Sequence, residues 1–450
     1  FFLFTRSETT NLRLRLNIMD KIFNNIPLPE RNPQSEYYCG GGCSMLLFEN
    51  AEKAELVKEC EKLKNAGFEL YQKNGIHSNL FFTFRKDITV HLSFFSALKQ
   101  FRIIADPCIS EYQREEIQVK HTSPTVLWQF EVDHSLIDCG MCYIIRCRDG
   151  SFFVIDSAHF YSINDDIRII NFLKKQSGEK KPRVAGWYFS HCHEDHVDKF
   201  LDILRFHRDE ISIDTLYYNF PSMECKGSEC WDYASKIKLK LFEDEIKKHP
   251  DIKSVRLHAG QVFFVKNIKI TVLCTHEDVY PASFEDFNNT STAIVAETEN
   301  TRILFPGDCS VESDKVLCKA YENDLKCDIV QVSHHGHTGC SSEFYEYAGA
   351  KCALFPVTSI KFDEDYPRHK ANRRAIELAR EWYVASNGTV EIPLPYGSKK
   401  TTVYPDETKE DWNGIYQLWC YEYTDEIKEN SFWNKNRHFS VTKKEQRLSK

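Results

Sequence analysis

One segment near the middle of the chain is rich in side chains that bind metal ions. It reads Ser190-His191-Cys192-His193-Glu194-Asp195-His196. An apolar run at 184–189 precedes it, and a helix-like run at 197–207 follows. Alternate residues at the end of a strand point the same way, so we expect His191 and His193 to converge on one ion. Asp195 and His196 lie where the chain turns into a helix, and they can face a second ion.

Two neighbouring metal ions would give this segment a definite chemistry. Such a pair can share a hydroxide and stabilise both oxygens of a displacement reaction. An exposed polar turn is the alternative interpretation. Three histidines and one aspartate within six residues favour the metal site. The same alternation turns Cys192 away from the ions, and we expect it to pack in the core.

Two later segments place further acidic and imidazole groups after apolar runs. The first is Ile303-Leu304-Phe305-Pro306-Gly307-Asp308, and the second is Val330-Gln331-Val332-Ser333-His334-His335-Gly336. Each segment alone could be an ordinary turn or loop.

The pattern His-x-His-x-Asp-His after a strand resembles the signature of the metallo-β-lactamase superfamily. Further similarities follow in that family's order across residues 126–397, beginning with a hairpin around Arg148-Asp149-Gly150. Asn288-x-x-Ser291 and the two later segments are closest to one branch. That branch contains the hydrolase domain of the bacterial DNA-uptake channel and the teichoic-acid phosphorylcholine esterases, and its members mostly cleave phosphodiesters. The chain departs from it at 138–142, where Asp-Cys-Gly-Met-Cys replaces a turn of the Gly-Gln-Gly-Asp type.

The resemblance implies six metal ligands, which are His191, His193, Asp195, His196, Asp308 and His335. The first two would hold one ion, the next two the other, and Asp308 would bridge them. One histidine of the pair 334–335 would complete the second ion's site, and we assign that role to His335. His334 would then lie beside the substrate as a hydrogen-bond or proton donor. We expect Asp195 and His334 to take part in catalysis. The implied cofactor is two divalent ions, with Zn²⁺ favoured over Mn²⁺ or Fe²⁺.

Other histidines are candidates for the surroundings of this site. Many superfamily members have an additional ligand between the first motif and the Gly-Asp element, and His258 and His276 occupy that interval. His276 is better placed because it follows the apolar run 268–274. The branch named above does without this ligand. His337 and His369 are expected to line the cleft.

The pattern of elements predicts an α/β architecture with two parts. A helix at 51–65 and strands at 68–72, 79–84, 88–95 and 101–105 predict a small α+β domain of unknown role at 19–120. From residue 126 strand-like and helix-like segments alternate, which with the resemblance predicts a four-layer αββα sandwich at 126–404. Its helices are expected at 168–175, 195–208, 231–248, 311–321, 341–347 and 369–383. Residues 1–18 are interpreted as an extension, and 405–450 as a charged aromatic tail.

Composition restricts the partners. The net charge of the 450 residues is −8, which does not favour nucleic acid as a partner. No run approaches the roughly 18 apolar residues of a membrane span. The 17 cysteines and the absence of a secretion signal fit a reducing cytoplasm. Cys139 and Cys142 have CxxC spacing, but no second such pair completes a zinc ribbon.

Together these features predict a binuclear metal-dependent hydrolase that acts on a small-molecule or phosphodiester substrate. A phosphodiesterase is favoured. Hydrolysis of a carboxylic ester, lactone or thioester is the first alternative, because the same hydroxide could attack those groups. A nuclease is the second. A catalytically silent binding module is the alternative of another class. The sequence makes no prediction of the oligomeric state.

Overall fold

The computed structural model describes residues 22–404, apart from residues 110, 135–136, 163 and 226–227, and two later strands. These are β23 (Ile415–Glu422) and β24 (Lys435–Thr442), which pair as an antiparallel hairpin. The predicted extension at 1–18 and the rest of the predicted tail lie outside the described residues. Within the described part of the chain, no helix has the length and apolar composition needed to cross a membrane.

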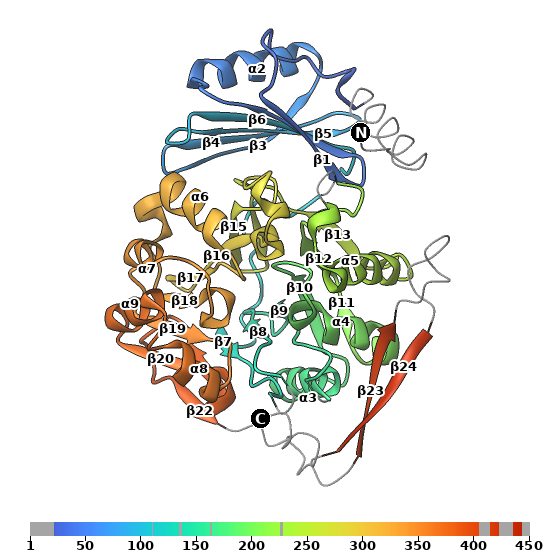
Figure 1. Ribbon diagram of the computed structural model, residues 1–450, viewed down its shortest axis with the longest axis vertical. Coiled ribbons are helices and arrows are strands. Elements are labelled where there is room, and N and C mark those ends of the chain that lie inside the picture. The colour runs from blue at the N-terminus through green and yellow to red at the C-terminus, as the bar shows by residue number, and fades with distance from the viewer. Residues whose placement is uncertain are drawn as a thin grey trace, which may run out of the picture.

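An N-terminal module, residues 35–106, is built from one antiparallel sheet and one long helix (Figure 1). Its sheet order is β1-β2-β6-β5-β4-β3. The bounds are β1 Ser35–Gly40, β2 Cys43–Phe48, β3 Glu69–Ile76, β4 Asn79–Arg85, β5 Thr89–Phe95 and β6 Gln100–Asp106. Helix α2 (Lys53–Asn65) buries Leu56, Cys60 and Leu63 against the sheet, a helical spacing that gives the module its own core.

The remainder forms two facing sheets. The first has the order β13-β12-β10-β9-β8-β7-β21-β22, with β11 beside β10. Its bounds are β7 Val126–Gln129, β8 Tyr143–Arg146, β9 Phe152–Ile155, β10 Arg183–Tyr188, β11 Ser212–Ile213, β12 Thr215–Tyr218, β13 Lys253–Arg256, β21 Thr389–Pro393 and β22 Thr402–Tyr404. The second has the order β14-β15-β16-β17-β18-β19-β20. Its bounds are β14 Val262–Val265, β15 Ile268–Cys274, β16 Ala293–Thr298, β17 Thr301–Phe305, β18 Ile329–Gln331, β19 Cys352–Phe355 and β20 Glu381–Val384.

Three apolar cores show that this part is a four-layer αββα sandwich, as predicted. One core lies between the two sheets. A second joins the first sheet to α3 (Asp165–Ser177), α4 (Glu194–Phe206) and α5 (Tyr233–Ile246). A third joins the second sheet to α6 (Val311–Tyr321), α7 (Ser342–Ala348) and α9 (Lys370–Leu378). Figure 1 shows these helix groups on opposite sides, with α8 (Ser359–Asp365) near α9.

The strand and the helix that flank the first metal motif, β10 and α4, form where the sequence pattern predicts them. Strand β10 is apolar on both faces because it runs parallel to its neighbours in the middle of a covered sheet. Helix α4 begins after His193 and buries Val197, Phe200, Leu201 and Leu204, which lie on one face. Glu194 and Asp195 occupy its first turn, where the helix dipole favours negative charge. Cys192 is fully buried in the adjoining core, so its prediction as a packing residue is confirmed.

The secondary-structure prediction is wrong at one helix end, and it lacks one hairpin and several short strands. The helix predicted at 369–383 ends at Leu378, and Glu381–Val384 is the edge strand β20. Its aromatic pair Trp382-Tyr383 suits a strand, and β20 pairs in parallel with β19. The hairpin β1–β2 was not predicted, because its Gly-Gly-Gly turn interrupts the pattern of a strand. The short strands β11, β13, β21 and β22 were also missed.

The N-terminal module packs on the sandwich through polar as well as apolar contacts. Arg102 of β6 forms a buried ion pair with Asp278, which follows β15. The Asn79 side chain donates to the carbonyl of Ala320 at 2.7 Å, and that of Asn74 donates to the carbonyl of Gly260 at 2.7 Å. These contacts, of which those of Arg102 and Asn79 are buried, hold the module on the sandwich.

Candidate metal centre

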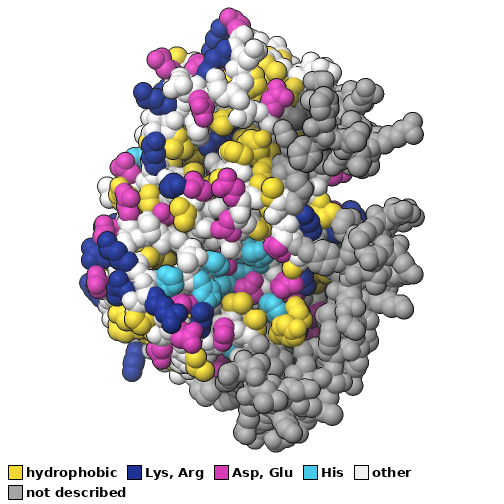
Figure 2. Space-filling view, in the orientation of Figure 1, with side chains coloured by type: hydrophobic (Ala, Val, Ile, Leu, Met, Phe, Trp, Pro, Cys, Tyr) yellow, Lys and Arg dark blue, Asp and Glu magenta, His cyan; other side chains and the backbone are white. Residues whose placement is uncertain are grey.

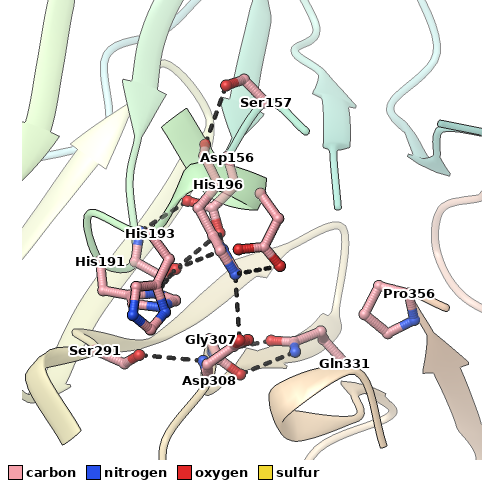
Figure 3. A network of polar contacts seen from close by, with 12 residues as sticks. Asp156, Ser157, His191, His193, His196, Ser291, Gly307, Asp308, Gln331 and Pro356 are labelled. Atoms are coloured by element: carbon pink, nitrogen blue, oxygen red, sulfur yellow. Dashed lines mark hydrogen bonds and ion pairs between the residues drawn. The ribbon is translucent and has the colours of Figure 1, made fainter. Parts of the chain in front are cut away.

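The sheet topology explains why the sequence motifs meet. Strands β9 and β10 are parallel, so Asp156 and Ser190, which follow them, lie at one edge of the first sheet. Strands β17 and β18 are parallel in the second sheet, which brings Asp308 and His335 to the matching edge. Residues at the carboxyl ends of strands in both sheets therefore form the site together (Figure 3).

Asp195, His196, Asp308 and His335 form a compact group. One ligand atom from each lies within 4.8 Å of the others. His335 Nε2 is 2.8 Å from Asp195 Oδ2 and 3.2 Å from Asp308 Oδ2. His196 Nε2 is 3.2 Å from the same Asp308 oxygen and 3.6 Å from Asp195 Oδ2. Two imidazoles thus face two carboxylates, a donor set that suits a divalent transition metal.

His191 and His193 lie beside this group as a second pair of donors. His191 Nε2 and His193 Nδ1 are 2.8 Å apart, and the rings of His191 and His196 are 4.2 Å apart. Burial lowers the pKa of His191 well below its ordinary value, and the neighbouring His196 and His193 lower it further. Burial also lowers the pKa of His193. Both rings are therefore neutral near pH 7, which is the state that binds a metal ion.

Asp156 orients His196 from behind. Its Oδ2 lies 2.9 Å from His196 Nδ1, so the proton sits on Nδ1 and Nε2 faces the carboxylates. Asp156 in turn accepts from the backbone N–H and the hydroxyl of Ser190, each at 2.8 Å. The sequence analysis missed this role. A carboxylate directly after a strand that neighbours β10 is the signal that could have shown it.

The structure separates His334 from His335. His335 Nδ1 donates to the carbonyl of Pro356 at 2.7 Å, which leaves Nε2 for the carboxylates. His334 is less buried and lies outside the four-residue group, with its Nε2 3.4 Å from the Asn288 amide nitrogen. Both histidines have left-handed backbone, with φ of +49° and +55°. Such strain in two adjacent residues is common at functional sites.

Gln331 and Ser291 hold the Gly-Asp element. The Gln331 amide accepts from Gly307 N–H at 2.9 Å and donates to the Gly307 carbonyl at 3.0 Å. The N–H of Asp308 donates to the Ser291 hydroxyl at 3.1 Å. Gln331 is fully buried in the otherwise apolar strand β18, and a lone amide in such a strand is the clue to its role.

Electrostatics and hydrogen bonding indicate that the group fits a cation. Burial alone would raise the pKa values of Asp195 and Asp308, but His196 and His335 hold both well below the ordinary range. Burial lowers the pKa of His335, but the two carboxylates overcome this and raise it to about 10. Asp308 Oδ1 is buried and, among the described residues, has no hydrogen-bond partner. An ionised carboxylate with an unmet buried oxygen is what a bridging ligand requires.

The rim of the site carries further titratable groups. Cys139 lies beside Asp195. Burial raises the pKa of its thiol, and the carboxylate raises it further. Asp365 of α8 lies 2.7 Å from His337 Nδ1 and 3.8 Å from His369 Nε2. Thus the two histidines expected at the cleft meet at one carboxylate. Figure 2 shows histidine side chains gathered on this face beside acidic and basic ones.

The two candidates for an additional ligand have other partners. His276 is fully buried, with Nδ1 2.9 Å from the Tyr37 hydroxyl and Nε2 3.1 Å from Asn219 Oδ1. His258 contacts Glu277 at 2.8 Å and Asp106 at 3.2 Å. All four ring nitrogens are therefore engaged away from the four-residue group.

Comparisons with known proteins give only distant similarities. No family profile and no curated protein matches the chain. The chain is similar to the metallo-beta-lactamase fold protein YhfI from Bacillus subtilis, with 12% identity over 58% of this chain and 97% of that chain and a TM-score of 0.36. It is also similar to CmlA, a diiron beta-hydroxylase from Streptomyces venezuelae, with 11% identity over 62% of this chain and 55% of that chain and a TM-score of 0.35. Zn²⁺-bound PqqB from Methylobacterium extorquens has 10% identity over 46% of this chain and 72% of that chain, with a TM-score of 0.28. Likenesses this weak leave the site to be assigned from its own residues.

Proposed function

We propose that this protein is a metal-dependent hydrolase of the metallo-β-lactamase superfamily that binds two divalent ions and cleaves phosphodiesters. The observation that carries the proposal is the convergence of Asp195, His196, Asp308 and His335, with one Asp308 oxygen buried and unpaired. The neutral pair His191 and His193 beside this group supplies donors for a further ion.

Each ligand has a place in this proposal. His191 and His193 would hold one ion, Asp195, His196 and His335 the other, and Asp308 would lie between them. When bound, the ions would supply Lewis acidity that activates water and stabilises negative charge. The chain itself fixes the directions of the donors. Asp156 and the Pro356 carbonyl hold the protons of His196 and His335 on Nδ1, so that each Nε2 is presented to the site.

His334 and Asn288 form the proposed substrate subsite. Because the Asn288 amide donates to His334 Nε2, a ring proton of His334 lies on Nδ1. Among the described residues, His334 Nδ1 and Asn288 Oδ1 are both buried without hydrogen-bond partners. Unmet polar atoms beside a metal centre fit contact with a polar substrate. His334 would donate a hydrogen bond or a proton to the leaving oxygen of the ester.

Turnover of bis-p-nitrophenyl phosphate tests this function. We expect the metal-loaded protein to hydrolyse it, and we expect activity to disappear with a chelator and in Asp308→Ala. Asp209→Ala is the matched control because Asp209 is exposed on the short helix after α4. It should retain activity. Metal analysis should give close to two ions at the centre.

Other outcomes lead to the alternative functions. Two bound ions without phosphodiester turnover would redirect the search to carboxylic esters, lactones and thioesters. A steep dependence of binding on salt would indicate a nucleic-acid substrate. A protein that binds no metal would be a silent binding module. A cytoplasmic location also belongs to the proposal, since the buried thiols of Cys60, Cys142, Cys192 and Cys274 are free, as in a reducing compartment.

A further inference from the structure

A second group of metal-binding side chains lies where the N-terminal module meets the sandwich. Cys39 and Cys43 flank the turn between β1 and β2, and Glu277 follows β15. One ligand atom of each lies within 4.8 Å of the other two. All three side chains are buried, with Cys43 fully so. The group shares no residue with the metal centre.

The Cys39–Cys43 turn is built to place two thiols together. Its residues Gly40, Gly41 and Gly42 all have positive φ, which reverses the chain within three residues. The turn also lies tightly against the sandwich, since a Cβ on Gly40 would be 2.1 Å from Ser222 Cβ. Side chains at these positions would prevent the approach. The hairpin therefore places both thiols beside Glu277, which is distant in the sequence.

Glu277 has one oxygen that the surrounding network does not use. Its Oε2 lies 2.8 Å from His258 Nδ1, and the opposite nitrogen of that ring lies 3.2 Å from Asp106 Oδ2. Asp106 is also engaged, by Arg256 at 3.1 Å and by the N–H of Cys108 at 2.8 Å. Among the described residues, Glu277 Oε1 is buried without a hydrogen-bond partner. This free oxygen points to a ligand for the carboxylate beside the thiols.

We propose that Cys39, Cys43 and Glu277 bind a zinc ion, separate from the metal centre, that fastens the N-terminal hairpin to the sandwich. Two thiolates are soft donors that favour zinc, and zinc also accepts a carboxylate oxygen. His258 orients Glu277 through its other oxygen, as a supporting residue does at many zinc sites. Cys43 also lies near Asp106 and His258, but the donor atoms of both are already engaged. This places the ion on the Glu277 side.

Cobalt substitution of the full chain tests the proposal. Co²⁺ bound to thiolate gives an intense near-ultraviolet charge-transfer band, whereas the six proposed ligands of the metal centre are nitrogen and oxygen donors. We expect the wild type to show the band. Cys43→Ser should lack the band and should bind one ion per chain fewer than the wild type. Cys60→Ser is the matched control, because Cys60 is a buried thiol in the core of the N-terminal module. It should keep both the band and the ion.

Two further variants separate this site from the metal centre. Asp308→Ala should abolish turnover but keep the band, so the two proposals can fail independently. Cys139→Ser should also keep the band. Loss of the band in Cys139→Ser would put the thiolate at the metal centre and overturn the proposal. A wild-type protein that binds Co²⁺ without the band overturns it as well, and this result needs no variant to fold. A Cys39–Cys43 disulfide, detected by thiol counting in denaturant, would have the same consequence.

Discussion

Gly307 lies directly against Ser190, and the two residues join the Gly-Asp element to the first metal motif. A Cβ on Gly307 would be 2.6 Å from Ser190 Cβ, and its backbone has φ of +62°. This position excludes every other residue type on two counts, contact and conformation. Ser190 also donates a hydrogen bond to Asp156, which holds His196. A displacement of Ser190 would therefore change the position of His196 as well.

Gly307→Ala is therefore expected to weaken metal binding and to destabilise the fold. Left-handed backbone at alanine costs about 1–2 kcal/mol, and the close contact adds about 1–3 kcal/mol. Denaturant unfolding and metal analysis would measure both effects. Gly178→Ala is the control, because Gly178 has φ of +74° with no atom within 4 Å of the added Cβ. Equal losses in the two variants would show that the contact with Ser190 does not matter.

Asp156→Asn tests the orientation of His196 without changing the size of the side chain. The amide can accept a hydrogen bond but carries no charge to stabilise the proton on His196 Nδ1. We expect metal affinity to fall about 10–100-fold, as is usual for a residue that supports a ligand. Titration of the apoprotein with Zn²⁺ against a competing chelator would measure it. An unchanged affinity would mean that the ring keeps its orientation through the backbone alone.

His334→Gln and His335→Gln should have different effects, although the residues are adjacent. Loss of His335 removes a proposed ligand, so this variant should lose metal and activity together. Loss of His334 should leave the metal content unchanged and lower kcat about 10²–10⁴-fold, the range for a general acid. Metal analysis beside steady-state kinetics separates the two. The assignment would be reversed if His334→Gln lost the ion and His335→Gln retained it.

His207 gives a pH dependence that is independent of the metal ions. Hydrogen bonding to Asp166 of α3 raises the pKa of His207 above its ordinary value of 6.5, despite the opposing effect of burial. A raised folded-state pKa means that the stabilisation is complete below pH 6.5 and is lost as the pH rises through the folded value. Between about pH 6 and about pH 8.5 the wild-type Tm should fall more than that of His207→Gln. Parallel melting curves would contradict this.

The architecture was largely predictable because its signals are local. The apolar run before His191 and the helical spacing after it fix a strand, a turn and a helix, whatever the rest of the chain does. The alternating elements after residue 126 then leave the layered sandwich as the natural arrangement. Short edge strands such as β20 escaped prediction, because a few residues carry too little pattern to separate a strand from the end of a helix.

The supporting contacts of the site were not predictable in the same way. The position of Asp156 after a strand and the lone amide of Gln331 in an apolar strand indicate supporting roles, but they do not show that Asp156 will hold a histidine and Gln331 a glycine. Those contacts depend on which strands become neighbours, and that is a property of the whole sheet. The group of Cys39, Cys43 and Glu277 is the extreme case, since Glu277 follows the two cysteines by more than two hundred residues.

The pairing of β7 with β21 also constrains how the chain can fold. Val126–Gln129 is bordered on one side by β8 and on the other by Thr389–Pro393. The first sheet therefore stays unfinished during synthesis until nearly the whole sandwich has left the ribosome. Until then β7 exposes an unpaired edge that can join the wrong partner. We therefore expect a chain truncated before residue 389 to be prone to aggregation, although every proposed metal ligand precedes that point.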